Sequence, residues 1–282
     1  MKNKGLAIPY VAWMAIFVVA PLVLVVVFAF TSKDGGFTLA NFSTMNQYVG
    51  VFVNSFVLAV VATLVCILIG YPLAYLLTRE GPGLRRAAMM LIMLPMWMNF
   101  LLRTYSWMSL LEDTGLINRF LQSIHFFDLI NGVFGTNLEF FHMINTPGAV
   151  VLGMVYNFLP FMVLPIFSVI DKIDPKVVEA AQDLGADGAT VFRRVIFPLS
   201  LPGVLSGITM VFIPSVSTFV ISSLLGGGKT VLLGDLIQMQ FFGNTYNPHL
   251  GSAISLVMMV IVLVCMALMN RFGSGEEEAM LL

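Results

Sequence analysis

The stretch that decides the fold is DPKVVEAAQDLGADGATVFRRVIFPLSLPG, residues 174–203, a polar segment inside an otherwise apolar sequence. Asp174 followed by Pro175 predicts a helix start, because an N-cap carboxylate and a proline at the first helical position are both favourable there. Gly185 fits the left-handed position that ends many helices, and Asp187 can cap a second helix. The sequence therefore predicts two short helices that meet at a glycine corner.

The first of these helices has one apolar stripe, because Val177, Ala181 and Leu184 recur at helical spacing. The second carries paired arginines, and Pro198 is expected to end it. Two amphipathic helices of this kind either dock into a partner or lie on lipid headgroups with the arginines on phosphates. Periodicity alone leaves both interpretations open.

The composition is that of a polytopic membrane protein. Of 282 residues, 59% are hydrophobic and only 10% are charged, and the mean hydropathy is +0.94, whereas a soluble domain is about 25% charged. The net charge of −1 gives no sign of a nucleic-acid partner. Cys66 and Cys265 both lie inside apolar runs and are interpreted as small buried hydrophobic residues.

Six apolar runs are long enough to cross a bilayer, which takes about 20 residues. The first follows Lys2 and Lys4 and lacks the short core and small-residue cleavage site of a signal peptide, so it is expected to remain as a span. The runs cover approximately residues 9–30, 51–78, 87–110, 147–170, 198–222 and 250–270.

Basic residues predict the orientation of these spans, because cytoplasmic segments carry an excess of Lys and Arg. With the N-terminus inside, ten basic residues face the cytoplasm and three face outward, so both termini are expected in the cytoplasm. The inner group is Lys2, Lys4, Arg79, Arg85, Arg86, Lys172, Lys176, Arg193, Arg194 and Arg271, and the outer group is Lys33, Arg119 and Lys229.

The remaining segments predict one permease domain over residues 1–282 with no separate soluble part. The outer loop 111–146 is expected to contain a short helix at FLQSIHFF, and the outer loop 223–249 to be helical around Leu232 to Phe242. The tail 271–282 is acidic and is expected to be loose in the cytoplasm.

The spacing inside the polar stretch resembles the EAA signature of bacterial ABC importer permeases, in which Glu-Ala-Ala, three residues, Gly and nine residues precede Ile-x-Leu-Pro. Here Val195 and Phe197 replace the Ile and Leu, and both keep apolar character. The resemblance implies that loop 174–197 is the cytoplasmic coupling loop that enters a groove on the ATPase subunit. The residues expected to contact the ATPase are Glu179, Ala180, Ala181, Gly185, Phe192 and Arg193.

Three further stretches, residues 95–107, 153–174 and 224–241, are similar to the permeases of spermidine/putrescine importers. They read PMWMNFLLRTYSW, GMVYNFLPFMVLPIFSVIDKID and LLGGGKTVLLGDLIQMQF. The resemblance implies an all-α, six-helix permease of the MetI-like type I fold in the bacterial inner membrane. It also implies two copies of an ATPase, a second and different permease chain, and an extracytoplasmic solute-binding protein as partners.

The resemblance further implies a small cationic substrate such as spermidine or putrescine. The outer segments carry a formal charge of −3, which favours cations but is screened beyond about 10 Å at 0.1 M salt. Arg103 inside a span suits an anion, so an importer of sulfate or molybdate is the alternative within the class. A secondary transporter is the rival from another class, but none of the six predicted spans contains the buried acid that usually couples ions.

Candidate pathway residues lie in span three, where Pro95, Asn99, Arg103 and Ser106 are expected on roughly one helix face. A charge at mid-span costs about 2.5–3.5 kcal/mol, so Arg103 should face protein or water. It lines the pathway, pairs with Glu112 or Asp113, or snorkels outward. Three aromatic residues in this region, Trp97, Tyr105 and Trp107, can stack on a substrate cation.

Spans four and five flank the polar loop and are expected to move and to line the pathway. Asn157 either makes an interhelical hydrogen bond or lines the pathway. Pro214 and Ser217 mark a proline break that is tolerated where freed backbone groups face protein or a cavity. Gly203-x-x-x-Gly207 predicts close helix packing.

The chain is expected to have no catalytic, cofactor or metal site of its own. The segment SLLGGGKT resembles a phosphate-binding P-loop, but Ser223 replaces the first glycine and a span precedes it instead of a strand. A glycine turn is the better interpretation. ATP hydrolysis is therefore expected on a partner subunit.

Overall fold

The computed structural model describes residues 8–135, 137–243 and 246–279, which form helices joined by turns. The helices are α1 (Ile8–Met14), the π-helical η2 (Ala15–Val19), α2 (Ala20–Ala29), α3 (Ala40–Thr44), the 3₁₀-helical η3 (Met45–Tyr48), α4 (Val49–Arg79), α5 (Pro82–Trp97), α6 (Phe100–Leu111), α7 (Leu116–Ser123), α8 (Phe126–Phe134), α9 (Pro147–Ile170), α10 (Pro175–Asp183), α11 (Gly188–Val191), the π-helical η4 (Phe192–Ile196), α12 (Phe197–Ser217), α13 (Val220–Leu225), α14 (Leu233–Phe242) and α15 (Pro248–Ala279).

The prediction of an all-α membrane protein is confirmed for the described residues. Five helical segments are long and apolar enough to cross a membrane, and a sixth is added if α5 and the segment from α6 through α7 count as one bent span. The five segments are 8–29, 40–79, 147–170, 188–217 and 248–269.

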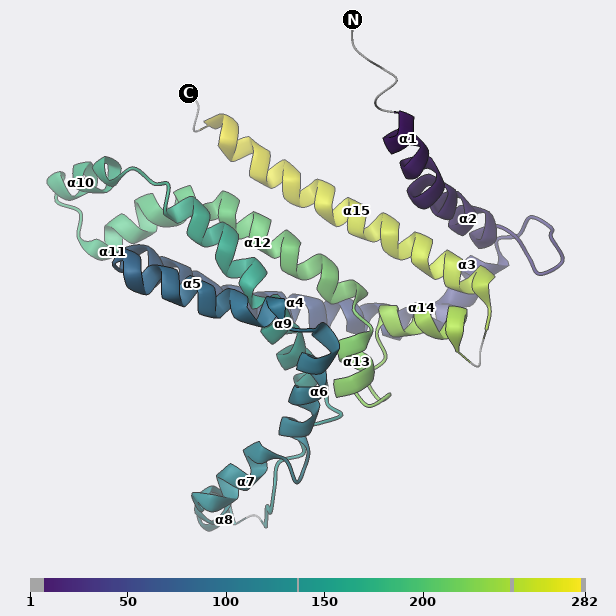
Figure 1. The fold of residues 1–282 in the computed structure, drawn as a ribbon, viewed down its shortest axis with the longest axis horizontal. Coiled ribbons are helices and arrows are strands. Elements are labelled where there is room, and N and C mark those ends of the chain that lie inside the picture. Colours follow the sequence, from purple (N-terminus) through teal and green to yellow (C-terminus); the bar gives the residue numbers. More distant parts are fainter. Residues whose placement is uncertain (1–7, 136, 244–245, 280–282) are drawn as a thin grey trace, which may run out of the picture.

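The core of the bundle lies between α4, α9 and α12, which pack on one another, while α15 packs on α2, α12 and α14 (Figure 1). Met154, Met162 and Ile166 of α9 are fully buried there. The end of α4, the start of α5, the end of α9 and the start of α12 meet at the end of the bundle that carries α10 and α11 (Figure 1). We call this the coupling end.

Two glycines bring α12 against α9. A Cβ atom at Gly203 would lie 2.8 Å from the Pro165 carbonyl oxygen, and one at Gly207 would lie 2.7 Å from Met162 Sδ. The close packing predicted from Gly203-x-x-x-Gly207 is therefore confirmed.

Gly203→Val is expected to lower the stability of the bundle by about 1–3 kcal/mol, the usual cost of overpacking a close contact. The obstacle is the α9 backbone, including Ile166 Cα at 3.1 Å, which cannot move aside as a flexible side chain would. The measurement is the midpoint of thermal unfolding of the purified permease in detergent. Gly50→Val is the matched control, because nothing lies within 4 Å of a Cβ there. Equal midpoints for both variants would contradict the packing argument.

Span three is broken, so the prediction of one continuous helix over 87–110 is wrong. The segments on either side of Met98 and Asn99 are bent by 95°. Met98 is extended, and the Asn99 side chain accepts hydrogen bonds from the amides of Leu101 (2.9 Å) and Leu102 (3.3 Å). Asn99 therefore starts a new helix as its N-cap. Because Pro95 lies before the break, it does not share a helix face with the residues of α6.

Span five begins earlier and ends earlier than predicted. α11, η4 and α12 run as one helical path over 188–217, so the prediction that Pro198 ends the second short helix is wrong. The wide π-helical turn just before Pro198 explains this, because it shifts the hydrogen-bond pattern where proline cannot donate. The path ends at Ser217, and Thr218 and Phe219 separate it from α13.

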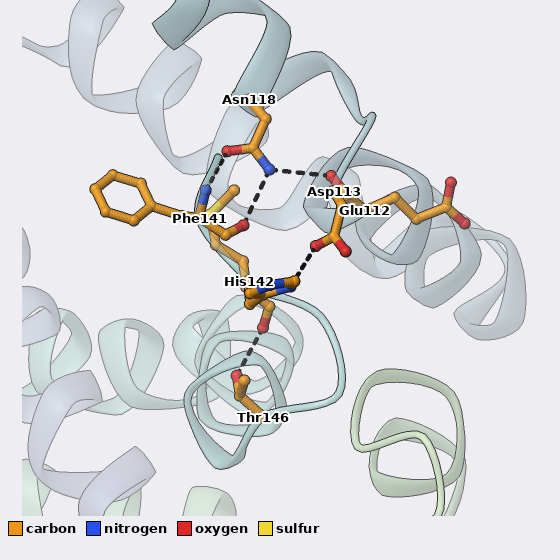
Figure 2. A network of polar contacts seen from close by, with 7 residues as sticks. Glu112, Asp113, Asn118, Phe141, His142 and Thr146 are labelled. Carbon is orange, nitrogen blue, oxygen red and sulfur yellow. Dashed lines mark hydrogen bonds and ion pairs between the residues drawn. The ribbon is translucent and has the colours of Figure 1, made fainter. Parts of the chain in front are cut away.

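The predicted helix in the outer loop 111–146 is two helices, α7 and α8, divided at His125, which has φ of 55°. With α6 they project from the bundle (Figure 1). Asn118 of α7 holds the segment that leads back from α8 to α9. Its Nδ2 donates to the carbonyls of Glu112 (3.2 Å) and Phe141 (3.0 Å), and its Oδ1 accepts from the Phe141 amide (Figure 2).

The predicted helix around Leu232 to Phe242 is confirmed as α14. It is packed into the bundle against α4, α12 and α15 instead of lying in an open loop. α15 continues to Ala279, so the prediction of a loose tail is wrong for residues 271–279, while 280–282 lie outside the described residues. Glutamate is a good helix former, which is consistent with this extension.

Candidate coupling loop and translocation pathway

The coupling loop, residues 174–197, has the local structure that its sequence predicts. Asp174 caps α10 by accepting from the Lys176 amide (3.0 Å), and Asp187 caps α11 by accepting from the Thr190 amide (2.9 Å). The hydrogen bonds from Thr190 lower the pKa of Asp187 below its usual value, since they favour the ionised carboxylate. Gly185 lies between the helices at φ of 82°, in the left-handed region.

The outer face of this corner is exposed. Glu179, Ala180, Gly185 and Arg193 are exposed, and the apolar side chain of Leu184 is 90% exposed. A hollow of about 510 Å³ lies inside the corner between α10 and η4. It is lined by Ala181, Leu184, Gly185, Ala186, Asp187, Thr190, Val191, Arg194 and Val195.

Phe192, predicted as an ATPase contact, points inward instead. Its ring centre lies 5.1 Å from that of Tyr75 and 5.9 Å from that of Tyr71, both on α4. The Tyr71 hydroxyl is also hydrogen-bonded to the Ser200 hydroxyl of α12 at 2.7 Å. We call Tyr71, Tyr75, Phe192 and Phe197 the aromatic link, because their rings join the coupling loop to α4 and α12.

A second set of contacts ties the coupling end together. Arg85 of α5 forms an ion pair with Asp171 at the end of α9 and lies 4.9 Å from the centre of the Phe167 ring. Arg79, the last residue of α4, lies over the Tyr75 ring at 4.4 Å. These contacts therefore join the start of α5 to the end of α9 and hold the last residue of α4 beside the aromatic link.

The pathway candidates of span three do not gather on one face. Trp97 is 84% exposed at the end of α5, on the other side of the break from Tyr105, which is exposed on α6. Tyr105 and Arg103 are two positions apart, so they point to different sides of α6. Asn99 acts as a helix cap, which accounts for its side-chain oxygen.

Arg103 is buried, with 7% of its surface exposed. Its Nε and Nη1 have no hydrogen-bond partner among the residues that the structure describes, and its guanidinium lies 5.8 Å from the centre of the Phe100 ring. Asp113, one of its two predicted partners, instead pairs with His142 Nδ1 at 3.1 Å (Figure 2). The described part of the chain holds no ion pair between Arg103 and Glu112 or Asp113, so that prediction is wrong.

In span four, Asn157 is buried and its Nδ2 donates to the Gly153 carbonyl of its own helix at 2.8 Å. Its Oδ1 has no partner among the described residues, so the predicted interhelical hydrogen bond is absent from this part of the structure. In span five, Pro214 and Ser217 are half-buried in the last turn of α12. Their roles in the pathway stay predictions.

Asp235 lies within the predicted outer loop 223–249, but the structure buries it, with 4% of its surface exposed. Its neighbour Gly234 lies against the end of α12: an added Cβ would be 2.5 Å from the carbonyl oxygens of Ser217 and Thr218. The apolar residues on both sides of Asp235 in VLLGDLIQMQF are the sequence feature that favours its burial. An aspartate in such a segment is nevertheless more often exposed.

Comparison with known proteins shows which family the chain belongs to. A model of the family described as "Binding-protein-dependent transport system inner membrane component" matches residues 66–274. The chain is 35% identical over 259 residues to the spermidine/putrescine transport system permease protein PotB of Haemophilus influenzae, covering 89% of this chain and 87% of that protein. It is also 35% identical over 260 residues to PotB of Escherichia coli K12, covering 89% and 90%.

Solved structures show the same fold at low sequence identity. A bacterial ABC transporter for import of the acidic polysaccharide alginate has a TM-score of 0.75 at 17% identity, covering 96% of this chain and 94% of that chain. The MetNI methionine ABC transporter has a TM-score of 0.58 at 17% identity, covering 83% and 97%. The chain is therefore a multi-pass inner-membrane permease and belongs to the family of binding-protein-dependent transport system inner membrane components.

Proposed function

We propose that the chain is the permease subunit of an ABC importer for polyamines such as spermidine and putrescine. The observation that carries this proposal is the 35% identity to spermidine/putrescine permeases over 89% of the chain. The buried acid Asp235 supports a cationic substrate, because a carboxylate in a low-dielectric interior attracts positive charge.

The coupling loop is the proposed contact with the ATPase. Glu179, Ala180, Ala181, Gly185 and Arg193 form the docking surface, and its exposed face supports this role. ATP binds more tightly to one conformation of the ATPase pair and so shifts the population of permease conformations. The aromatic link then transmits the motion to α4 and α12, and Phe192 acts as a link residue within the chain.

The proposed assembly contains two copies of the ATPase, a second and different permease chain and an extracytoplasmic binding protein. One related solved structure is of the alginate transporter with its alginate-bound periplasmic protein, which supports a binding protein here. We place both termini and the coupling loop in the cytoplasm. The C-terminal end of α15 lies toward the coupling end in Figure 1, which supports this orientation.

Lys229 is expected outside the cytoplasm, where a membrane-impermeant amine reagent will label it in intact cells with a permeabilised outer membrane. It is exposed in the turn after α13, at the end of the bundle away from the coupling loop. Lys176, which is exposed in α10, is the internal control and should be labelled only after lysis. The reverse pattern would contradict the proposed orientation.

An anion importer for sulfate or molybdate is the second candidate. It is favoured by the buried Arg103, two of whose nitrogens have no partner among the residues with described positions. Uptake in cells separates the two. A strain in which the gene is deleted should lose uptake of labelled spermidine and keep uptake of labelled sulfate, and the gene on a plasmid should restore the spermidine uptake. Loss of sulfate uptake alone would reject the polyamine assignment.

A further inference from the structure

The break between α12 and α13 leaves the C-terminal end of α12 inside the protein. α12 ends at Ser217, and Thr218 is extended at φ −65° and ψ 142°. Among the described residues, no backbone N–H caps the last carbonyls of α12. The C-terminal end of a helix carries a partial negative charge, so this end favours a cation.

Asp235 lies directly beside this helix end, because the preceding residue, Gly234, packs on the carbonyl oxygens of Ser217 and Thr218. Only 4% of the surface of Asp235 is exposed. Its Oδ2 accepts from the Leu232 amide at 2.9 Å. Its Oδ1 is buried and has no partner in the described part of the chain.

Burial raises the pKa of the Asp235 carboxyl above its usual value, because it disfavours the charged form, while hydrogen bonds from the Ser222 hydroxyl of α13 and the Leu232 amide act in the opposite direction. The Ser222 hydroxyl proton, however, is donated to the Phe219 carbonyl at 3.1 Å. A carboxylate oxygen can accept more than one hydrogen bond, so Oδ1 keeps an open acceptor position even when the Ser222 hydroxyl turns toward it.

The helices around Asp235 supply no counter-ion. Neither α12 nor α13 contains a charged residue, and α4 carries only Arg79, at its far end. On α15, His249 Nδ1 contacts a backbone carbonyl of α2 at 3.2 Å, and Arg271 lies six turns further along. Arg103, on α6 at the other side of α13, makes no hydrogen bond or ion pair to Asp235 within the described residues.

A capping role explains only half of this arrangement. Asp235 is the third residue of α14 and its Oδ2 binds the N-cap amide, which is an ordinary use of an acid at a helix start. It does not explain why Oδ1 is buried without a hydrogen-bond donor among the described residues. An unpaired buried carboxylate oxygen is costly, so its burial needs a further reason. A cation bound at Oδ1 would remove that cost.

We propose that Asp235 Oδ1 and the carbonyl oxygens of Ser217 and Thr218 form an internal site for one primary ammonium group of the substrate. This inference rests on the proposed polyamine function. Discontinuous membrane helices that end beside unwound backbone are a general way to bind cations within a transporter.

The low exposure of Asp235 means that the site is occluded in this conformation. A substrate reaches it when the segment at Thr218 and Phe219 opens, and the closed form then holds the ammonium away from either side. The site thus provides the intermediate binding position that alternating access requires.

The test is ATP-dependent uptake of labelled spermidine and putrescine by the complete reconstituted complex carrying Asp235→Asn. Asparagine has the same size and can still accept the Leu232 amide, but it has no charge. The KM for both polyamines is expected to rise about tenfold or more, the usual value of a charged hydrogen bond, with ATP hydrolysis without substrate unchanged. Ser55→Ala is the structural control, because Ser55 Oγ accepts from the Leu233 amide at 2.8 Å and holds the start of α14 without any charge.

A second variant distinguishes the loss of a binding carboxylate from a general change in the structure. Ser222→Asp in the Asp235→Asn background is expected to lower the KM again, because it returns a carboxylate to the same region from α13. Unchanged KM in Asp235→Asn, or the same rise in KM in Ser55→Ala, would overturn the inference while leaving polyamine import intact. A wild-type complex that imports no polyamine would instead reject the proposed function.

Discussion

Gly185→Val is expected to reduce polyamine uptake by tenfold or more while the ATPase continues to hydrolyse ATP. Gly185 has φ of 82° between α10 and α11, and a β-branched residue is a strong outlier there. A side chain at this position costs about 1–2 kcal/mol in the left-handed conformation. Nothing lies within 4 Å of its Cβ position, so the effect comes from the backbone alone. The corner will open, and the docking surface will lose its shape.

Gly188→Val is the matched control for this prediction. Gly188 is three residues away on the same exposed corner, also has no atom within 4 Å of its Cβ position, and does not have a positive φ. The measurement is the ratio of spermidine imported to ATP hydrolysed in proteoliposomes. A normal ratio in Gly185→Val, or an equal loss in Gly188→Val, would contradict the role of the left-handed corner.

Phe192→Ala is expected to have the second largest effect, lowering both the stability of the coupling end and the ratio of import to hydrolysis. The ring is half-buried between Tyr71 and Tyr75 and also lies 6.3 Å from Phe197. Its removal should cost on the order of 2–3 kcal/mol, less than a fully buried Phe→Ala. The coupling loop would then move without carrying α4 and α12 with it.

The measurements are the thermal midpoint of the purified complex and the import ratio. Phe192→Leu keeps apolar volume and is expected to recover most of the stability and part of the coupling. Phe17→Ala is the control, because Phe17 is 63% exposed on η2, away from the coupling end. If the complex with Phe192→Ala has a normal import ratio despite its lowered stability, the aromatic link does not transmit motion from the coupling loop to α4 and α12.

The coupling loop and span four could be predicted closely from the sequence, because their signals are local. Caps at Asp174 and Asp187 and the corner at Gly185 depend on a few adjacent residues, and these are found as predicted. Span four was expected at 147–170, and α9 has those bounds, since Thr146 caps it and Pro147 begins it.

The break in span three and the π-helical entry to span five could not be predicted in the same way. Both segments stay apolar through the irregular turn, so hydrophobic runs extend across it. Asn99 was expected to line a pathway, yet its side chain caps α6 and starts a new direction. Pro198 was expected to end a helix, yet a preceding π-helical turn accommodates it.

The burial of Asp235 and the inward direction of Phe192 depend on tertiary packing, which explains why neither could be predicted from the sequence. Asp235 lies in a segment that follows a glycine turn and resembles an outer loop. Its burial results from α14 packing against α4, α12 and α15, which are far from it in the sequence. The inward side chain of Phe192 is likewise set by Tyr71 and Tyr75, more than 100 residues earlier.

The central claim is most directly tested by reconstituting the chain with its ATPase, the second permease and the binding protein in proteoliposomes. The measurement is accumulation of labelled spermidine, with labelled sulfate in parallel. Spermidine is predicted to accumulate only when both ATP and the binding protein are present, and sulfate is not. Accumulation of sulfate instead, or spermidine uptake driven by an ion gradient without ATP, would contradict the account.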